Sequence, residues 1–307
     1  MESVRTLLTE IIDYAGLFPP SGLGMTEAVE HYANHLNSKH RWMLGRFVCP
    51  VTAIEDFDAA ATDLLPKGET DDPWRLSGIV APESLSEQID RIFRFNDHHE
   101  TVVEAGRCVI DVIETKASSA SDIERIMKIV PEQIEPFIEL NHTTDLRGII
   151  AAIAGTGGRA KIRCGGVTPK AIPTAEQIAR FIANCAAAEV SFKFTAGLHH
   201  PVRAEQNLTY VAQPPRAMMH GFLNVFTAAT MARVNRLGEP ELVQILQETD
   251  PKAFIFTEGG LTWHEHFAPT ARLARVRESF AISVGSCSFT EPVDDLIAIG
   301  LLEREKV

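Results

Sequence analysis

Two lysines stand inside short apolar segments, where lysine is rare. Lys161 lies in the segment AKIRCGG (160–166) and Lys193 in SFKFTAG (191–197), and both segments end in glycine. A lysine is costly to bury unless it has a partner or takes part in chemistry. The pattern therefore favours an amine nucleophile that forms a Schiff base with a carbonyl substrate.

The spacing of the two lysines suggests how such an amine is activated. A helix-like stretch (174–188) separates their segments, which predicts neighbouring parallel strands ~4.8 Å apart. Two ammonium groups ~5 Å apart at an effective dielectric of ~20 repel by roughly 3 kcal/mol. That repulsion would bring the pKa of one lysine from ~10.4 to about 8. The alternative is that each lysine pairs with a carboxylate and is structural.

Two carboxylates occupy similar positions in other apolar segments. Asp111 lies in VIDVI (109–113) and Glu139 in PFIEL (136–140). Alternate residues of a barrel strand face the interior, so these two carboxylates and the two lysines are expected to face one pocket. We therefore predict Lys161, Lys193, Asp111 and Glu139 as the catalytic set.

The elements that must position these residues alternate along the chain. Near-continuous apolar runs indicate strands at 44–49, 76–81, 108–113, 136–140, 160–164, 192–196, 253–256 and 280–284. Helical patterns follow at 54–65, 84–95, 120–129, 143–154, 175–188 and 218–237. This order predicts a (β/α)₈ barrel, with an open doubly wound sheet as the alternative. We expect one domain (1–307), with an N-terminal helical extension (1–40) and an enlarged late βα region (199–279).

Glycine and serine follow several of the predicted strands and suggest an anion site. They are Gly165, Gly166, Gly197, Gly285, Ser286 and Ser288. Exposed backbone N–H groups and hydroxyls at strand ends can hold a phosphate. The alternative is that the glycines serve tight turns alone.

Histidines offer a metal-dependent alternative. His199 and His200 are adjacent, so on an extended segment they point in opposite directions. His264 and His266 would share one face and could bind a divalent metal together with a carboxylate. His220 shares a helix face with Asn224. We nevertheless expect no metal and no cofactor.

The composition narrows the class of protein. The net charge of −12 argues against a nucleic-acid partner. No apolar run is long enough to span a membrane, and the five scattered cysteines favour reduced thiols in the cytoplasm. We expect a small-molecule substrate, with or without a phosphate. A homo-oligomer is left open.

The ordered motifs resemble those of deoxyribose-phosphate aldolase and its class I aldolase relatives. That family carries a K-T-S-T-G strand, a K-x-x-G-G strand, a final F-G-A-S-S strand and an I-I-E-T strand. The corresponding segments here are KIRCG (161–165), KFTAG (193–197), VGSCS (284–288) and FIEL (137–140), with IDYAGLFP (12–19) similar to I-D-H-T-x-L-K-P.

The resemblance implies roles for these residues. Lys161 would form the Schiff base, Lys193 would lower its pKa and Asp111 would join the proton relay. The glycines and serines named above would hold a phosphate. The change from K-T-S-T to KIRC places Arg163 near the site, and LHH (198–200) brings His199 and His200 there.

Three functions follow from these patterns. The first is an aldolase-like, Schiff-base-forming lyase acting on a small aldehyde, ketone or sugar phosphate. The second is a metal-dependent barrel hydrolase or isomerase. The third is a non-catalytic ligand-binding barrel.

Overall fold

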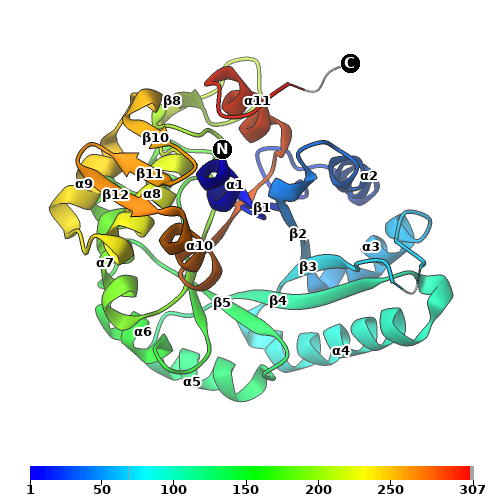
Figure 1. Cartoon of the computed structure of the whole chain (residues 1–307). Coiled ribbons are helices and arrows are strands. Elements are labelled where there is room, and N and C mark those ends of the chain that lie inside the picture. Colours follow the sequence, from blue (N-terminus) through cyan, green and yellow to red (C-terminus); the bar gives the residue numbers. More distant parts are fainter. Residues whose placement is uncertain (69, 305–307) are drawn as a thin grey trace.

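A closed barrel of parallel strands forms the centre of the described structure. The computed structural model describes residues 1–68 and 70–304, and eight strands within them close the barrel (Figure 1). In chain order they are β1 (Ile12–Tyr14), β2 (Leu44–Pro50), β3 (Trp74–Ile79), β4 (Cys108–Lys116), β5 (Glu135–Leu140), β6 (Arg159–Arg163), β7 (Phe192–Thr195) and β13 (Ala281–Ser286). Strands β1 and β13 pair with each other and complete the (β/α)₈ barrel.

Helices follow the barrel strands and cover them. They are α2 (Met25–Leu36), α3 (Ile54–Ala61), α4 (Leu85–Thr101), α5 (Ala120–Ile129), α6 (Arg147–Ile153), α7 (Ala175–Ala188), α8 (Phe222–Val234) and α11 (Thr290–Ala298). Helix α1 (Glu2–Leu8) precedes β1. The expected start of α7 is confirmed, because Thr174 and Gln177 form a capping box.

Alternation along a strand separates the apolar shell from the barrel interior. Phe192 and Phe194 point outward from β7, and both pack edge-on against Phe181 of α7, with ring centroids 5.1 and 6.2 Å apart. Lys193 lies between these two phenylalanines and therefore points into the barrel. The main hydrophobic core thus lies between strands and helices, and the interior is left for charged groups.

Two predicted elements differ from the structure: the N-terminal helical extension (1–40) and the barrel strand at 253–256. The 1–40 segment is not a helical extension alone, since it contains barrel strand β1. The predicted barrel strand at 253–256 is instead β10 (Phe254–Phe256), which pairs antiparallel with β11 (Gly260–Trp263). The three-residue strand β1 carries a charge, so its apolar pattern is too short to recognise, whereas 253–256 is apolar enough to imitate a barrel strand.

Additional elements fill the segment between β7 and β13. They comprise the hairpin of β8 (Ala204–Asn207) and β9 (Arg216–Met219), helices α9 (Glu239–Gln247) and α10 (Thr270–Ser279), and strand β12 (His266–Pro269). The sheet of β10, β11 and β12 (orange in Figure 1) lies outside the barrel beside α8 and α10. In the described part of the chain, every helix is too short or too polar to cross a membrane.

Candidate active site

A buried network of charges crosses the barrel interior. Lys161 Nζ lies 2.5 Å from Glu114 Oε2 and 2.8 Å from Glu139 Oε2. Lys193 Nζ lies 2.7 Å from Glu114 Oε1 and 2.5 Å from Asp13 Oδ2. Glu114 therefore bridges the two lysines.

Two serine hydroxyls complete the network. Ser77 Oγ donates to Glu114 Oε1 at 2.9 Å, and Ser283 Oγ donates to Asp13 Oδ2 at 2.6 Å. The backbone N–H of Arg46 donates to the second oxygen of Asp13 at 2.9 Å. Each buried carboxylate oxygen named here has a donor, which is the condition under which buried charge is tolerated.

Strand register brings the two lysines together. Glu139 on β5, Lys161 on β6 and Lys193 on β7 occupy adjacent register positions in the parallel sheet. Side chains at one height of neighbouring barrel strands converge on the axis. The prediction that the two lysines and Glu139 meet inside the barrel is therefore confirmed.

Asp111 does not reach the lysines, contrary to expectation. The register between β3 and β4 jumps at this point, from Leu76 opposite Ile110 to Ser77 opposite Val112, so Asp111 is the extra residue of a β-bulge. Strict alternation would place Asp111 and Glu114 on opposite faces. The bulge lets both face the interior, with Asp111 about 10 Å nearer the N-terminal end of the barrel.

Arginines hold Asp111 at that end. Arg46 Nε and Nη2 donate to its two oxygens at 2.7 and 2.8 Å, and Arg75 Nη2 donates at 2.8 Å. Burial disfavours its charge, but these guanidinium groups outweigh burial and lower the pKa of Asp111. Its role in this structure is to orient the two arginines.

The electrostatics of the network differ from simple lysine–lysine repulsion. Burial disfavours the charged form of Lys193, but the carboxylates of Asp13 and Glu114 outweigh burial and raise its pKa. Burial likewise disfavours the charge of Glu114, yet Lys161 and Lys193 outweigh it and lower the pKa of Glu114 well below the ordinary range. Repulsion between the two lysines does not lower the pKa of Lys193, because a carboxylate lies between the two ammonium groups.

The two lysines differ in their access to solvent. Lys161 lines a cavity of about 430 Å³ at the C-terminal ends of β2 to β6, together with Glu114 and Glu139. Lys193 lies deeper and is 1% exposed, against 5% for Lys161. A substrate in this cavity would meet Lys161 first, at the end of the barrel where barrel enzymes place their active sites.

A second cavity of about 520 Å³ shares part of this wall. Lys116 and Glu139 line both cavities, and Arg163 lines the second one. Lys116 Nζ lies 3.8 Å from Glu139 Oε1. Arg163 is exposed and lies beside the lysine cavity, as the sequence suggested.

The glycines expected to hold an anion pack against one another. A Cβ on Gly165 would lie 2.6 Å from the Cα of Gly197, and a Cβ on Gly166 would lie 2.8 Å from the Cβ of Ala171. Gly197 has φ +73°, a conformation that favours glycine. Gly165 and Gly197 allow the segments that follow β6 and β7 to pack closely, and Gly166 packs against Ala171.

The other residues of the predicted anion site have partners within the fold. A Cβ on Gly285 would lie 2.9 Å from Thr195 Oγ1. Ser286 Oγ donates to Ser288 O at 2.7 Å and lies 3.1 Å from His199 Nδ1. Ser288 Oγ accepts from the N–H of Glu291 at 3.2 Å.

The histidines do not join the lysines. His199 is buried, and burial lowers its pKa while Glu291 opposes the shift. His200 Nδ1 lies 2.6 Å from Asp295 Oδ2. His264 and His266 lie nearest to Glu248 and Glu265, at 3.5 and 3.8 Å.

The metal alternative lacks a ligand set. Among residues 1–68 and 70–304, no three His, Cys, Asp or Glu side chains are grouped so that they could hold a metal ion. His220 Nε2 lies 2.8 Å from Pro173 O, and Asn224 Nδ2 donates to Ile245 O at 2.8 Å. Both residues therefore have partners within the fold.

Sequence reasoning missed Glu114, Asp13, Ser77 and Ser283. Asp13 lies within the IDYAGLFP segment that resembles the aldolase N-terminus, so the resemblance could have indicated it. Glu114 follows Val112 and Ile113 directly, and a charge at the end of an apolar strand could also have indicated a site residue. The bulge hides its inward direction, because alternation counted from Asp111 gives the wrong face.

Comparisons with known proteins add little. No protein-family model matches the chain, and no curated protein matches it at a significant level. One solved structure that matches is lysine/ornithine decarboxylase from Vibrio vulnificus, complexed with cadaverine, with a TM-score of 0.36 and 10% sequence identity. The match covers 63% of this chain and 48% of that one, so it spans about half of the decarboxylase. A likeness this low says nothing about activity, and the relation to class I aldolases stays a resemblance of short motifs.

Proposed function

We propose that this barrel is a Schiff-base-forming lyase of the aldolase type, with Lys161 as the nucleophile. The observation that carries the proposal is the place of the Lys161 amine. It lies on the wall of an open cavity at the C-terminal end of the barrel, 2.8 Å from one carboxylate and 2.5 Å from another. An amine between two proton acceptors is suited to gain and lose protons during carbonyl addition.

Glu139 is the proposed acid and base. It accepts a proton from the Lys161 ammonium, and the neutral amine attacks the carbonyl carbon of the substrate. The resulting carbinolamine loses water after Glu139 returns the proton to its hydroxyl. Glu139 then removes the proton of the substrate's β-hydroxyl, the carbon–carbon bond breaks, and its electron pair passes to the protonated imine, so that a carbonyl fragment leaves and an enamine remains. Glu139 returns the proton to the enamine carbon, and water hydrolyses the imine to release the second fragment and Lys161.

Glu114 and Lys193 support this cycle from behind the Lys161 amine. Lys193 is held as a cation by Asp13 and Glu114, so it is not the nucleophile. Its charge keeps Glu114 ionised beside Lys161. The ionised Glu114 would stabilise the positively charged imine nitrogen through the same contact that now holds the ammonium.

The substrate is proposed to be a small aldehyde, ketone or sugar phosphate. The cavity of about 430 Å³ lies within the size range of small-molecule sites. Arg163 and Lys116 lie on the adjoining cavity and would accept an anionic substituent. The fold alone does not fix this chemistry.

A non-catalytic ligand-binding barrel is the second candidate. The ion pairs of both lysines favour it, because paired lysines also suit a structural role. The open cavity at Lys161 favours catalysis instead. The two candidates differ in whether Lys161 forms a covalent adduct.

Borohydride trapping separates these candidates. Wild-type protein is incubated with small aldehydes, 2-oxo acids or sugar phosphates, reduced with borohydride and weighed by mass spectrometry. We expect one adduct per chain with at least one of these compounds. Lys161→Arg should abolish it, while Lys116→Arg, at an exposed lysine of the same cavity, should retain it. No adduct across the panel would favour the non-catalytic barrel.

A further inference from the structure

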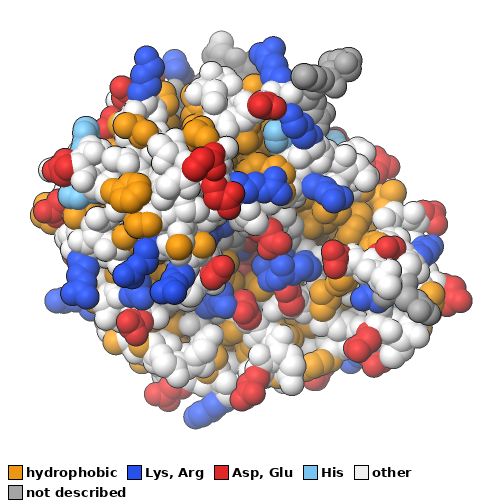
Figure 2. Space-filling model, in the orientation of Figure 1, with side chains coloured by type: hydrophobic (Ala, Val, Ile, Leu, Met, Phe, Trp, Pro, Cys, Tyr) orange, Lys and Arg blue, Asp and Glu red, His pale blue; other side chains and the backbone are white. Residues whose placement is uncertain are grey.

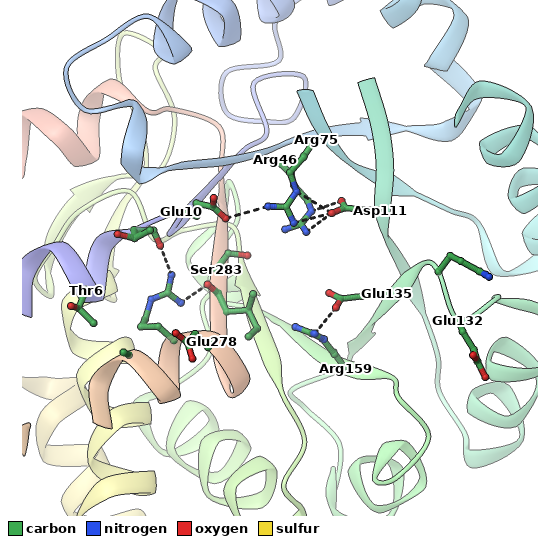
Figure 3. Close-up of a pocket in the computed structure, with 15 residues that line it drawn as sticks. Thr6, Glu10, Arg46, Arg75, Asp111, Glu132, Glu135, Arg159, Glu278 and Ser283 are labelled. Atoms are coloured by element: carbon green, nitrogen blue, oxygen red, sulfur yellow. Dashed lines mark hydrogen bonds and ion pairs between the residues drawn. The ribbon is translucent and has the colours of Figure 1, made fainter. Parts of the chain in front are cut away.

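A third cavity, larger than the other two, lies at the opposite end of the barrel. It has a volume of about 660 Å³, within the range of small-molecule sites, and is lined by residues from the N-terminal parts of the strands (Figure 3). Arg46, Arg75 and Arg159 come from β2, β3 and β6, and Arg277 comes from α10. Barrel interiors are usually filled by branched apolar side chains, so four guanidinium groups here require a reason.

The floor of this cavity carries excess positive charge. Three lining carboxylates pair with three of the four floor arginines: Asp111 with Arg46 and Arg75, Glu135 with Arg159, and Glu10 with Arg75 at 3.3 Å. Glu132 and Glu278 are exposed at the rim, where water and salt screen them. Figure 2 shows positive and negative side chains next to one another near the centre of the face that carries α1.

The floor arginines are oriented but keep unused donors. Asp111 holds Arg46 through Nε and Nη2, and Glu135 holds Arg159 through Nη2 at 2.6 Å. Within residues 1–68 and 70–304, Arg46 Nη1 and Arg159 Nε and Nη1 make no hydrogen bond. Burial lowers the pKa of Arg159, Glu135 opposes the shift, and the like charge of Arg46 adds to it.

Arg277 is a buried cation without a carboxylate at contact distance. It donates to the carbonyl oxygens of Leu7, Thr9, Ala281 and Ile282. Among the described residues, no carboxylate lies within ion-pair distance of it, and Asp13 and Glu10 act on it from further away. Burial lowers the pKa of Arg277 to about 10. An anion in the cavity would supply the missing counter-charge.

We infer that this cavity binds a small anion carrying a phosphate or carboxylate group, held by the free donors of Arg46 and Arg159. Such a group offers several acceptor oxygens to these separate guanidinium donors, and hydrogen bonds between charged partners are the strong ones. Arg75 and Arg277 add to the positive field. The site is separate from the Lys161 cavity, because it lies at the opposite ends of the same strands.

The site also adjoins the lysine network. Ser283 lines the cavity and donates to Asp13, which pairs with Lys193. Ser283 therefore belongs both to the cavity wall and to the surroundings of the Asp13–Lys193 pair. The inference about binding does not depend on Schiff-base chemistry.

Isothermal titration calorimetry tests the inference on the full chain. Inorganic phosphate, succinate and citrate are each titrated at an ionic strength held constant with sodium chloride. We expect saturable binding, at one site per chain, of at least one of the three. The difference between phosphate and the carboxylates identifies which oxyanion the floor prefers.

Variants locate the binding. Arg159→Gln should weaken the affinity about tenfold or more, as for the loss of one charge-assisted hydrogen bond. Arg147→Gln, which removes an exposed guanidinium that lines none of these cavities, should leave it unchanged. If Arg159→Gln does not fold by circular dichroism, Arg75→Gln replaces it, with several-fold weaker binding expected. Absence of saturable binding of all three anions, or weakening by Arg147→Gln that equals the weakening by the floor variants, would overturn the inference.

Discussion

The Glu114 carboxylate accepts a hydrogen bond from Lys193 at 2.7 Å, with both side chains buried at the centre of the barrel. Its other oxygen accepts from Lys161 at 2.5 Å. One carboxylate therefore compensates two lysines on neighbouring strands. The two lysines have different surroundings as a result, since Lys193 is enclosed and Lys161 borders a cavity.

Replacing Glu114 should destabilise the fold strongly. Glu114→Gln removes the shared counter-charge and leaves two buried cations with one carboxylate each, which we expect to cost about 3–5 kcal/mol. Urea unfolding at pH 7 measures this. Glu135→Gln, at a half-exposed ion pair, should cost about 1 kcal/mol or less. Equal stability of the two variants would contradict the bridging role.

The pH dependence of stability follows from the two pKa shifts. The pKa of Glu114 is lowered, so its stabilisation is present above the unfolded value of ~4.3 and is lost as pH falls towards the folded value. The pKa of Lys193 is raised, so its stabilisation is present below ~10.4 and is lost as pH rises towards the folded value.

We therefore expect this network to contribute a constant stability between about pH 5 and pH 10. Urea midpoints measured from pH 3 to pH 11 test this. The acid decline should be shallower in Glu114→Gln than in the wild type. A decline that begins near pH 8 and disappears in Lys193→Met would show that Lys193 titrates early, contrary to the raised pKa.

Glu139 should control the rate of adduct formation more than stability. Glu139→Gln keeps the shape but removes the proton acceptor, and a positioned general acid or base contributes about 10²–10⁴-fold. Samples are reduced with borohydride at successive times after the carbonyl compound is added. The fraction of modified protein in each sample gives the rate of adduct formation. Glu83→Gln, an exposed carboxylate on the same cavity, is the matched control. Similar rates in both variants would remove Glu139 from the mechanism.

Asp111 should prove structural. Asp111→Asn weakens the hydrogen bonds to Arg46 and Arg75, so the free energy of unfolding should fall by about 1–3 kcal/mol. The borohydride adduct should form at the wild-type rate, because Asp111 lies at the other end of the barrel. A folded variant that forms no adduct would return Asp111 to the proton relay implied by the aldolase resemblance.

The glycine pair between β6 and β7 should resist substitution. Gly197→Ala places a Cβ near the Gly165 backbone at φ +73°, and we expect a loss of more than about 1–2 kcal/mol. Gly148→Ala, in α6 with open space around it, should gain roughly 0.5–1 kcal/mol. Thermal unfolding measures both. A tolerated Gly197→Ala would contradict the packing role.

Much of the barrel could be predicted from apolar periodicity. Seven barrel strands match predicted runs, and α5 and α7 match the predicted ranges 120–129 and 175–188. These segments have long, regular apolar patterns that indicate a strand or a helix. Strand β1 has no such pattern, because only three residues form it and one of them is Asp13.

Only part of the candidate site could be predicted from the sequence. Lys161, Lys193 and Glu139 sit at matching strand positions, so counting along the strands brings them together. The sequence pattern predicted Asp111 as a carboxylate beside the lysines, whereas Glu114 occupies that place in the structure. A bulge at Asp111 changes the face on which each later residue of the strand lies. The partner of Lys193, Asp13, lies 180 positions away in the chain, and no local pattern connects them.

The site of borohydride adduct formation tests the central claim most directly. After trapping with a small carbonyl compound, proteolysis and tandem mass spectrometry identify the modified lysine. The account predicts a reduced adduct on Lys161 and none on Lys193, which is enclosed and held as a cation. An adduct on Lys193, or on the exposed Lys116 with Lys161 unmodified, would contradict it.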